Sequence, residues 1–175
     1  VLDELLTSRS APLYQKLRYQ KQSVTSFATY VSPLSTDPHW MLLGAELSLE
    51  RFQKEGTKYV DEVRYDVIGG TEALKNFSLE PNAAKTLEVL KSRVKNDFLA
   101  GWDTTDHIAQ SLATFYRFNR DAHVLDALLQ SVDELQPADI DDYATKYFTR
   151  DGRLVCTLWH GQQQPEAAPK KADGH

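Results

Sequence analysis

The sequence predicts an α+β domain in which several helices pack on one face of a small antiparallel sheet. Two observations predict this fold class. Near the N-terminus, residues 23–32 and 39–50 alternate in a period of two, and the turn-rich segment SPLSTDP joins them. From Tyr59 to Phe148, in contrast, apolar side chains recur at helical spacing. A run of strands followed by a run of helices is typical of an α+β arrangement.

The first element is expected to be a helix over about residues 1–21, interrupted near residues 8–12. Leu13 and Leu17 recur there at helical spacing, and the first strand follows within a few residues. Arg18 therefore stands in the last turn of this helix, where the chain enters the sheet. A cation at that place can lie over a groove beside a strand edge.

The second strand is expected to have one fully apolar face and a second face that is mostly apolar. The first face carries Met41, Leu43, Ala45 and Leu47, and the second carries Trp40, Leu42 and Glu46. A third strand is expected over residues 153–159, after a turn at residues 149–152. The single cysteine, Cys156, falls within this last strand, where a buried and inert thiol is expected.

Five helices are expected between the second and third strands. They are marked by apolar side chains that follow Tyr59, Pro81, residues 103–106, Asp121 and Pro137. The first of these helices contains Gly69 and Gly70, which are expected to end or kink it. This pair lacks the spacing of a phosphate-binding loop, so no ligand role is assigned to it. The third helix is expected to turn Ile108, Leu112 and Phe115 toward the core.

Composition excludes several classes of partner. The 175 residues are 41% hydrophobic and 26% charged, which is ordinary for one soluble domain with its own core. The net charge of −5, with acidic and basic residues intermixed, argues against a nucleic-acid partner. No apolar run reaches the roughly 18 residues that a membrane-spanning helix needs. A single cysteine excludes an internal disulfide and leaves the compartment open.

Two stretches of the sequence carry an order of residues that occurs in a known family. The first, around the helix–strand junction, contains Ser10, Leu13, Tyr14, Leu17, Arg18, Asp37 and Pro38. The second contains Leu90, Lys91, Asp97, Phe98, Pro137, Ala138, Asp139, Ile140, Tyr147, Phe148, Thr149, Asp151, Gly152, Arg153, Leu154 and Val155. In this order and spacing, residues 1–160 resemble the C-terminal, non-catalytic half-domain of the insulinase-like (pitrilysin-type) zinc peptidases.

The resemblance implies how the chain is organised. A full half-domain of that family has one or two further strands and a helix at its start, so this chain is expected to be a fragment that lacks the first strands. Val1 lies within an amphipathic pattern with no cap before it, in keeping with that expectation. Residues 1–160 would form one domain, and the polar residues 161–175 would form a disordered tail. Similar proteins are often exported, which slightly favours the bacterial periplasm over the cytoplasm.

The resemblance also implies that the catalytic zinc is bound outside this chain. The catalytic half of the family binds zinc through an H-x-x-E-H motif. No two of the five histidines lie within five residues of each other; they are His39, His107, His123, His160 and His175. Zinc, its ligands and the general base would therefore belong to a catalytic half-domain, in the same chain or in a separate subunit. This chain would hold no metal and no cofactor, and would help bind a peptide substrate by closing a clamshell around it.

In that family the non-catalytic half directs an arginine and, seven residues later, a tyrosine toward the scissile carbonyl next to zinc. Arg18 occupies the arginine position, where a cation stabilises an oxyanion as it forms. Thr25 occupies the tyrosine position and departs from the family pattern. Its hydroxyl can donate a hydrogen bond but is several ångströms shorter in reach, so it could not make the same contact.

Alternatives remain open at this point. Arg18 is equally well explained as a solvated or ion-paired arginine at a helix C-terminus, which the helix dipole favours by about 0.3–1 kcal/mol. The domain as a whole could be a degenerate structural or assembly domain of the same fold without a part in catalysis, an interpretation that Thr25 favours somewhat. An unrelated helical adaptor would explain the helices but not the paired strands and the final strand.

Overall fold

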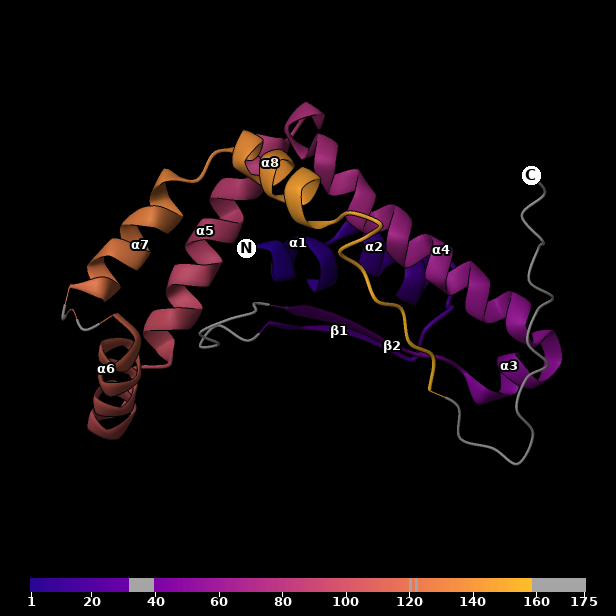
Figure 1. The fold of residues 1–175 in the computed structure, drawn as a ribbon, viewed down its shortest axis with the longest axis horizontal. Helices are drawn as coiled ribbons and strands as arrows, with labels where there is room; N and C mark the ends of the chain where they lie inside the picture. The colour runs from indigo at the N-terminus through magenta and orange to yellow at the C-terminus, as the bar shows by residue number, and fades with distance from the viewer. Residues whose placement is uncertain (32–39, 120, 122, 159–175) are drawn as a thin grey trace.

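The computed structural model describes residues 1–31, 40–119, 121 and 123–158. Within them the fold is mostly helical with one antiparallel hairpin, which confirms the predicted α+β class. Figure 1 shows the long helix α4 on one side, the hairpin on the other, and the short N-terminal helices between them. The expected disordered tail, residues 161–175, lies outside the described residues.

The hairpin consists of β1 (Ser26–Val31) and β2 (Met41–Glu46), paired antiparallel from Ser26↔Glu46 to Val31↔Met41. Because side chains alternate across a strand, Phe27 and Leu43 face the helices and contact the core, whereas Tyr30 and Leu42 lie exposed. The turn-rich segment expected between the strands, residues 32–38, lies outside the described residues.

The N-terminal helix is interrupted as predicted. It comprises α1 (Leu2–Thr7), the short α2 (Pro12–Tyr14) and a π-helix η1 (Gln15–Gln20) that follows α2 without a break. Pro12 opens α2 at a position where the missing N–H costs no intrahelical hydrogen bond. The π-helix was not expected from the sequence.

The region after β2 differs from the prediction in where the strand ends and in the effect of the glycine pair. The strand ends at Glu46, and Ser48 caps a helix α3 (Leu49–Glu55) by accepting a hydrogen bond from the backbone N–H of Arg51. Helix α4 (Thr57–Ala73) then runs straight through both glycines, so the expected end or kink is wrong. The physical reason is packing: a Cβ on Gly70 would lie 2.6 Å from Cδ2 of Leu13, so the glycine lets the two helices approach closely.

Of the remaining helices, η2 was not expected, and the other four begin near the predicted points. The remaining helices are η2 (a 3₁₀ helix, Leu74–Leu79), α5 (Ala83–Ala100), α6 (Thr105–Asn119), α7 (Val124–Glu134) and α8 (Pro137–Tyr147). Helix α8 starts with Pro137 and a capping box between Gln136 and Asp139. The expected burial along α6 is wrong: Ile108 and Phe115 are half-buried, and Leu112 is 42% exposed.

The expected third strand is not formed. Residues 153–158 form no strand with any other described segment, and Leu154 and Leu158 are 88% and 97% exposed. Cys156 is exposed rather than buried, so its expected environment is also wrong. An alternating sequence favours extended backbone, but a strand forms only where a second strand offers hydrogen-bond partners.

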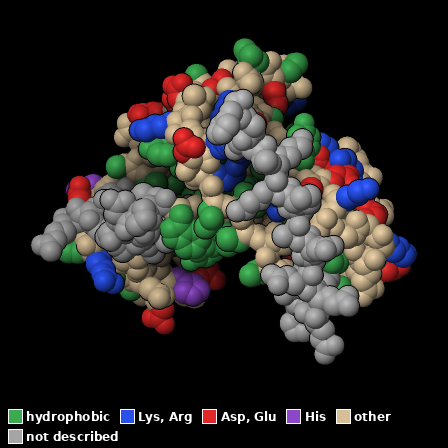
Figure 2. Space-filling model, turned by 45° about the vertical axis from the view of Figure 1, so that its right-hand side comes forward, with side chains coloured by type: hydrophobic (Ala, Val, Ile, Leu, Met, Phe, Trp, Pro, Cys, Tyr) green, Lys and Arg blue, Asp and Glu red, His purple; other side chains and the backbone are tan. Residues whose placement is uncertain are grey.

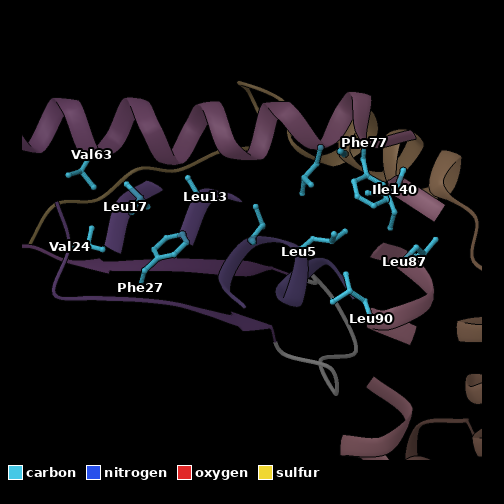
Figure 3. Close-up of a cluster of buried hydrophobic side chains, with 14 of the residues drawn as sticks. Leu5, Leu13, Leu17, Val24, Phe27, Val63, Phe77, Leu87, Leu90 and Ile140 are labelled. Atoms are coloured by element: carbon cyan, nitrogen blue, oxygen red, sulfur yellow. The ribbon is translucent and has the colours of Figure 1, made fainter. Parts of the chain in front are cut away.

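The core lies between the hairpin and the helices that cover it (Figure 3). It consists of Leu5, Leu6, Leu13, Leu17, Val24, Phe27, Tyr59, Val63, Leu74, Phe77, Ala83, Leu87, Leu90, Ile140 and Ala144. Val24 lies between η1 and β1, and the others come from α1, α2, η1, β1, α4, η2, α5 and α8, so one continuous core joins the N-terminal helices to α8. Leu17 of η1 is fully buried in it, which fixes one side of the π-helix against the core.

Candidate functional site

The two residues predicted at the junction lie side by side where η1 leads into β1. Arg18 is exposed, and its Nη1 donates a hydrogen bond to the carbonyl oxygen of Val24 at 3.0 Å. Thr25 is the next residue along the chain. Its backbone N–H and its hydroxyl both donate to the carbonyl oxygen of Glu46, at 2.8 and 3.2 Å. The structure therefore brings Arg18 and Thr25 together at the open end of the hairpin.

This junction is held in two uncommon backbone conformations. The π-helix closes with an i→i+5 hydrogen bond from the N–H of Lys21 to the carbonyl of Lys16, at 2.9 Å. Gln22 then adopts a positive φ of 47°, which a residue with a side chain adopts only infrequently. π-Turns are rare overall, and many of those that occur lie at functional sites. Arg18 lies within the π-helix and Gln22 follows it by four residues, so both irregularities fall at the junction and make it the leading candidate site.

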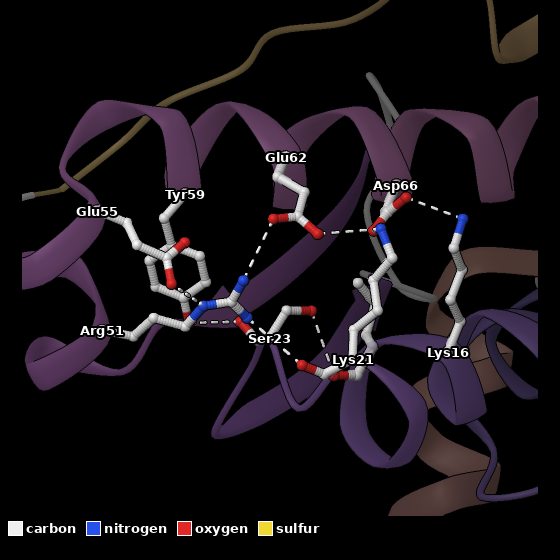
Figure 4. A network of polar contacts seen from close by, with 9 residues as sticks. Lys16, Lys21, Ser23, Arg51, Glu55, Tyr59, Glu62 and Asp66 are labelled. Carbon is white, nitrogen blue, oxygen red and sulfur yellow. Dashed lines mark hydrogen bonds and ion pairs between the residues drawn. The ribbon is translucent and has the colours of Figure 1, made fainter.

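Behind the junction, a buried carboxylate joins η1 to α4 (Figure 4). The side chain of Asp66 is 2% exposed, and its Oδ1 and Oδ2 pair separately with Nζ of Lys16 at 2.8 Å and of Lys21 at 2.7 Å. Lys21 also pairs with Glu62 at 3.0 Å. The lysine chains remain partly exposed, so the charges meet at the edge of the core rather than inside it.

The charges in this network stabilise one another. Burial by itself raises the pKa of Asp66, but hydrogen bonds and positive charge from Lys16 and Lys21 outweigh it and hold that pKa below its ordinary value. Hydrogen bonds to Asp66 and Glu62 raise the pKa of Lys21. Asp66 and Lys21 are therefore both charged at neutral pH.

Tyr59 of α4 also holds the turn between η1 and β1. Its buried hydroxyl donates to the carbonyl oxygen of Ser23 at 2.6 Å and accepts from the backbone N–H of Ser48 at 3.1 Å. The guanidinium of Arg51 lies over its ring, 4.5 Å from the centroid. Arg51 also donates to the carbonyl of Lys21 and pairs with Glu62. The turn after η1 is thus tied to α3 and α4 as well as to β1.

The outward face of the hairpin carries an apolar strip. Tyr30 and Leu42 are opposite each other across the two strands, and the ring of Trp40 lies 5.6 Å from that of Tyr30. All three side chains are about half exposed. The next pair toward Thr25 is Ala28 and Gly44, whose small size leaves the strip flat.

Charges on the rest of the surface are intermixed. Figure 2 shows acidic and basic side chains interspersed on the face that it displays, consistent with the net charge of −5. In the described part of the chain, no group of three or more histidine, cysteine, aspartate or glutamate side chains could hold a metal ion. His39, His160 and His175 lie outside that part. None of the described helices combines the length and apolarity needed to cross a bilayer.

Sequence reasoning placed Arg18 and Thr25 but missed the residues that hold their junction. Lys16 and Lys21 are five residues apart, which puts them on different faces of an α-helix, so their pairing with Asp66 could not be read from helical spacing. Helix α3 did have a signal: Ser48 followed by Glu50 is a common helix start.

Comparisons with known proteins support the fold. No family model matches the sequence, and no match was found among curated proteins. Among solved structures, the chain is similar to a protease from Helicobacter pylori, with a TM-score of 0.61 and 20% sequence identity. The match covers 85% of this chain and 33% of the protease chain. This chain therefore shares its fold with part of a bacterial protease and spans about a third of that protein's length.

Proposed function

We propose that this chain is the non-catalytic C-terminal half-domain of an insulinase-like zinc metallopeptidase, formed by residues 1–160. It would complete a clamshell chamber and help bind peptide, while zinc, its ligands and the general base belong to another domain or subunit. Two findings together carry the proposal. The chain shares its fold with a third of a protease, and Arg18 lies at the helix–strand junction where the family resemblance implies an arginine.

Peptide binding is supported by the hairpin. Within the described residues each strand is paired on one side only, so an outer edge offers backbone N–H and C=O groups to an extended peptide. The apolar strip of Tyr30, Trp40 and Leu42 adds side-chain surface beside these edges. A substrate laid along the hairpin would run past Arg18 at the end where β1 begins.

Arg18 is the residue we expect to act on the substrate. A guanidinium has five N–H donors, so the bond from its Nη1 to Val24 anchors the group while leaving capacity for a substrate oxygen. In a chamber that excludes water, this cation would stabilise the oxyanion that forms on the scissile carbonyl. The hydroxyl of Thr25 already bonds the neighbouring strand, so its proposed contribution is alignment of the junction.

The test is peptide hydrolysis by the zinc-bearing half alone, with the wild-type chain added, and with Arg18→Ala added. Arg64→Ala is the matched control, because Arg64 is a similarly exposed arginine that pairs with Asp61 on its own helix. We expect wild type and Arg64→Ala to restore turnover and Arg18→Ala to lower it about 100-fold, as for loss of one oxyanion donor. Equal turnover with all three chains would refute a role for Arg18 in the reaction.

A second candidate function is a structural or assembly domain of the same fold. Arg18 and Thr25 both donate to carbonyls of this domain, which is also what a purely structural junction would do. If the two halves bind each other but the chain leaves the rate of hydrolysis unchanged, the structural function is favoured. If every variant restores turnover, the domain builds the chamber without touching the reacting atoms.

A further inference from the structure

We propose that Asp66 is a positioning residue whose carboxylate selects the π-turn of η1 and thereby directs Arg18. The consequence for catalysis rests on the proposed function, whereas the clamp on the backbone stands on its own geometry. The clamp is the set of contacts from Asp66 to Lys16 and Lys21.

The first step is the register of the two lysines. In an α-helix each residue turns about 100°, so residues five apart lie about 140° apart around the axis. From that arrangement the two lysines leave opposite sides of the helix, so pairing both with one carboxylate on a neighbouring helix would require extended, less favourable side-chain conformations. In a π-turn the i→i+5 hydrogen bond brings residue i+5 closer to the side of the helix on which residue i lies. The bond from Lys21 to Lys16 does this, and the two ammonium groups reach separate oxygens of Asp66.

The second step is the cost of breaking the clamp. A carboxylate buried like that of Asp66 is strongly destabilising when it has no partner. An α-helical register would turn one lysine away from it. The π-turn, which has poorer intrinsic stability than an α-turn, is therefore the conformation that keeps both oxygens paired.

The third step is the position of α4. Gly70 follows Asp66 by four residues and so lies on the same face of the helix. Because Gly70 has no Cβ, α4 can approach Leu13 at the start of the segment that leads into η1. Close approach at Gly70 and ion pairing at Asp66 thus fix the same helix against α2 and η1 at successive turns.

The last step connects the clamp to Arg18. Arg18 follows Lys16 by two residues and so faces away from α4, toward the carbonyl of Val24. The segment from Lys21 to Val24 contains Gln22 with its positive φ. If Lys21 rotated into an α-helical register, this segment would have to change and would move the carbonyl that anchors Arg18.

The test compares Asp66→Asn with Asp61→Asn in the chain bound to its zinc-bearing half. Asparagine keeps the size of aspartate and removes the charge, and Asp61 is an exposed acid on the same helix. In Asp66→Asn we expect amide hydrogen exchange at residues 19–21 to rise about tenfold, because local opening becomes easier. We also expect kcat to fall about tenfold through misplacement of Arg18, with KM little changed. Asp61→Asn should change neither quantity.

Two further variants make the outcomes decisive. Lys16→Met removes the clamp from its more exposed side and should raise exchange at the same amides, even if Asp66→Asn fails to fold. In an Arg18→Ala background, Asp66→Asn should cause no further loss of kcat. If amide hydrogen exchange at residues 19–21 is unchanged in Asp66→Asn and Lys16→Met, the proposal that Asp66 selects the π-turn is refuted. If Asp66→Asn lowers kcat equally with and without Arg18, the proposal that the clamp acts through Arg18 is refuted. If Arg18→Ala alone leaves kcat unchanged, the proposed function fails in that respect, and exchange alone decides the clamp.

Discussion

The N-terminal region, from α1 to α4, and the outer helices α6 and α7 differ in what covers their apolar side chains. Leu6, Leu17, Val24 and Tyr59 in the first region are almost fully buried. Along α6 and α7 no described side chain is buried, although both helices have clear apolar faces. Helical periodicity therefore predicts a helix and the side chains that share a face, but not whether anything packs on that face.

A leucine-to-alanine pair gives the largest expected contrast between the regions. Leu17→Ala removes a fully buried side chain from η1 and should lower the free energy of unfolding by about 2–5 kcal/mol. Leu112→Ala in α6 removes a side chain that is already 42% exposed and should lower it by less than about 1 kcal/mol. Urea unfolding followed by circular dichroism measures both, and equal losses would contradict the comparison.

The adjacent glycines of α4 sharpen the comparison within one helix. Gly70→Ala places a Cβ against buried Leu13 and should destabilise the protein by about 1–3 kcal/mol. Gly69→Ala meets nothing within 4 Å and should stabilise α4 by up to about 1 kcal/mol, because alanine has the higher helix propensity. Thermal unfolding of the two variants measures the difference. The same sign for both would show that helix propensity, rather than the contact with Leu13, governs this site.

A smaller effect is expected from pH, and it separates the buried clamp from exposed ion pairs. The pKa of Asp66 is lowered from an ordinary value of 3.8, so its contribution is present above that value and is lost as pH falls through the lower folded-state pKa. The pKa of Lys21 is raised from 10.5, so its contribution is present below that pH and is lost only above it. Between pH 5 and pH 2 the wild type should therefore lose more stability than Asp66→Asn in urea unfolding. Parallel curves would mean that Asp66 is not stabilised as a carboxylate.

The sequence predicted what depends on local pattern. The α+β class, the paired strands, the interruption before Pro12 and the start of α8 at Pro137 follow from periodicity and from the conformational preferences of proline. Helical spacing placed Arg18 at the helix–strand junction, whereas Thr25 was singled out only because the family resemblance implies a residue seven positions after the arginine.

The remainder depends on contacts between distant segments. The π-turn needs Asp66, which is 45 residues beyond Lys21, and α4 continues through its glycines because Leu13 packs there. Neither contact leaves a mark on the local sequence. The segment at 153–158 shows the converse: a strand-like pattern without a described partner stays unpaired.

Cys156 gives this exposed segment a chemical reporter. It is the single cysteine of the chain, so a thiol reagent attaches at one defined position. Leu154 and Leu158, two residues to either side, are almost fully exposed. In extended backbone these three side chains share one face, so any surface that packs on that face would shield all three at once. The alkylation rate of the Cys156 thiol therefore measures how accessible this segment is, both in the isolated chain and in any larger assembly.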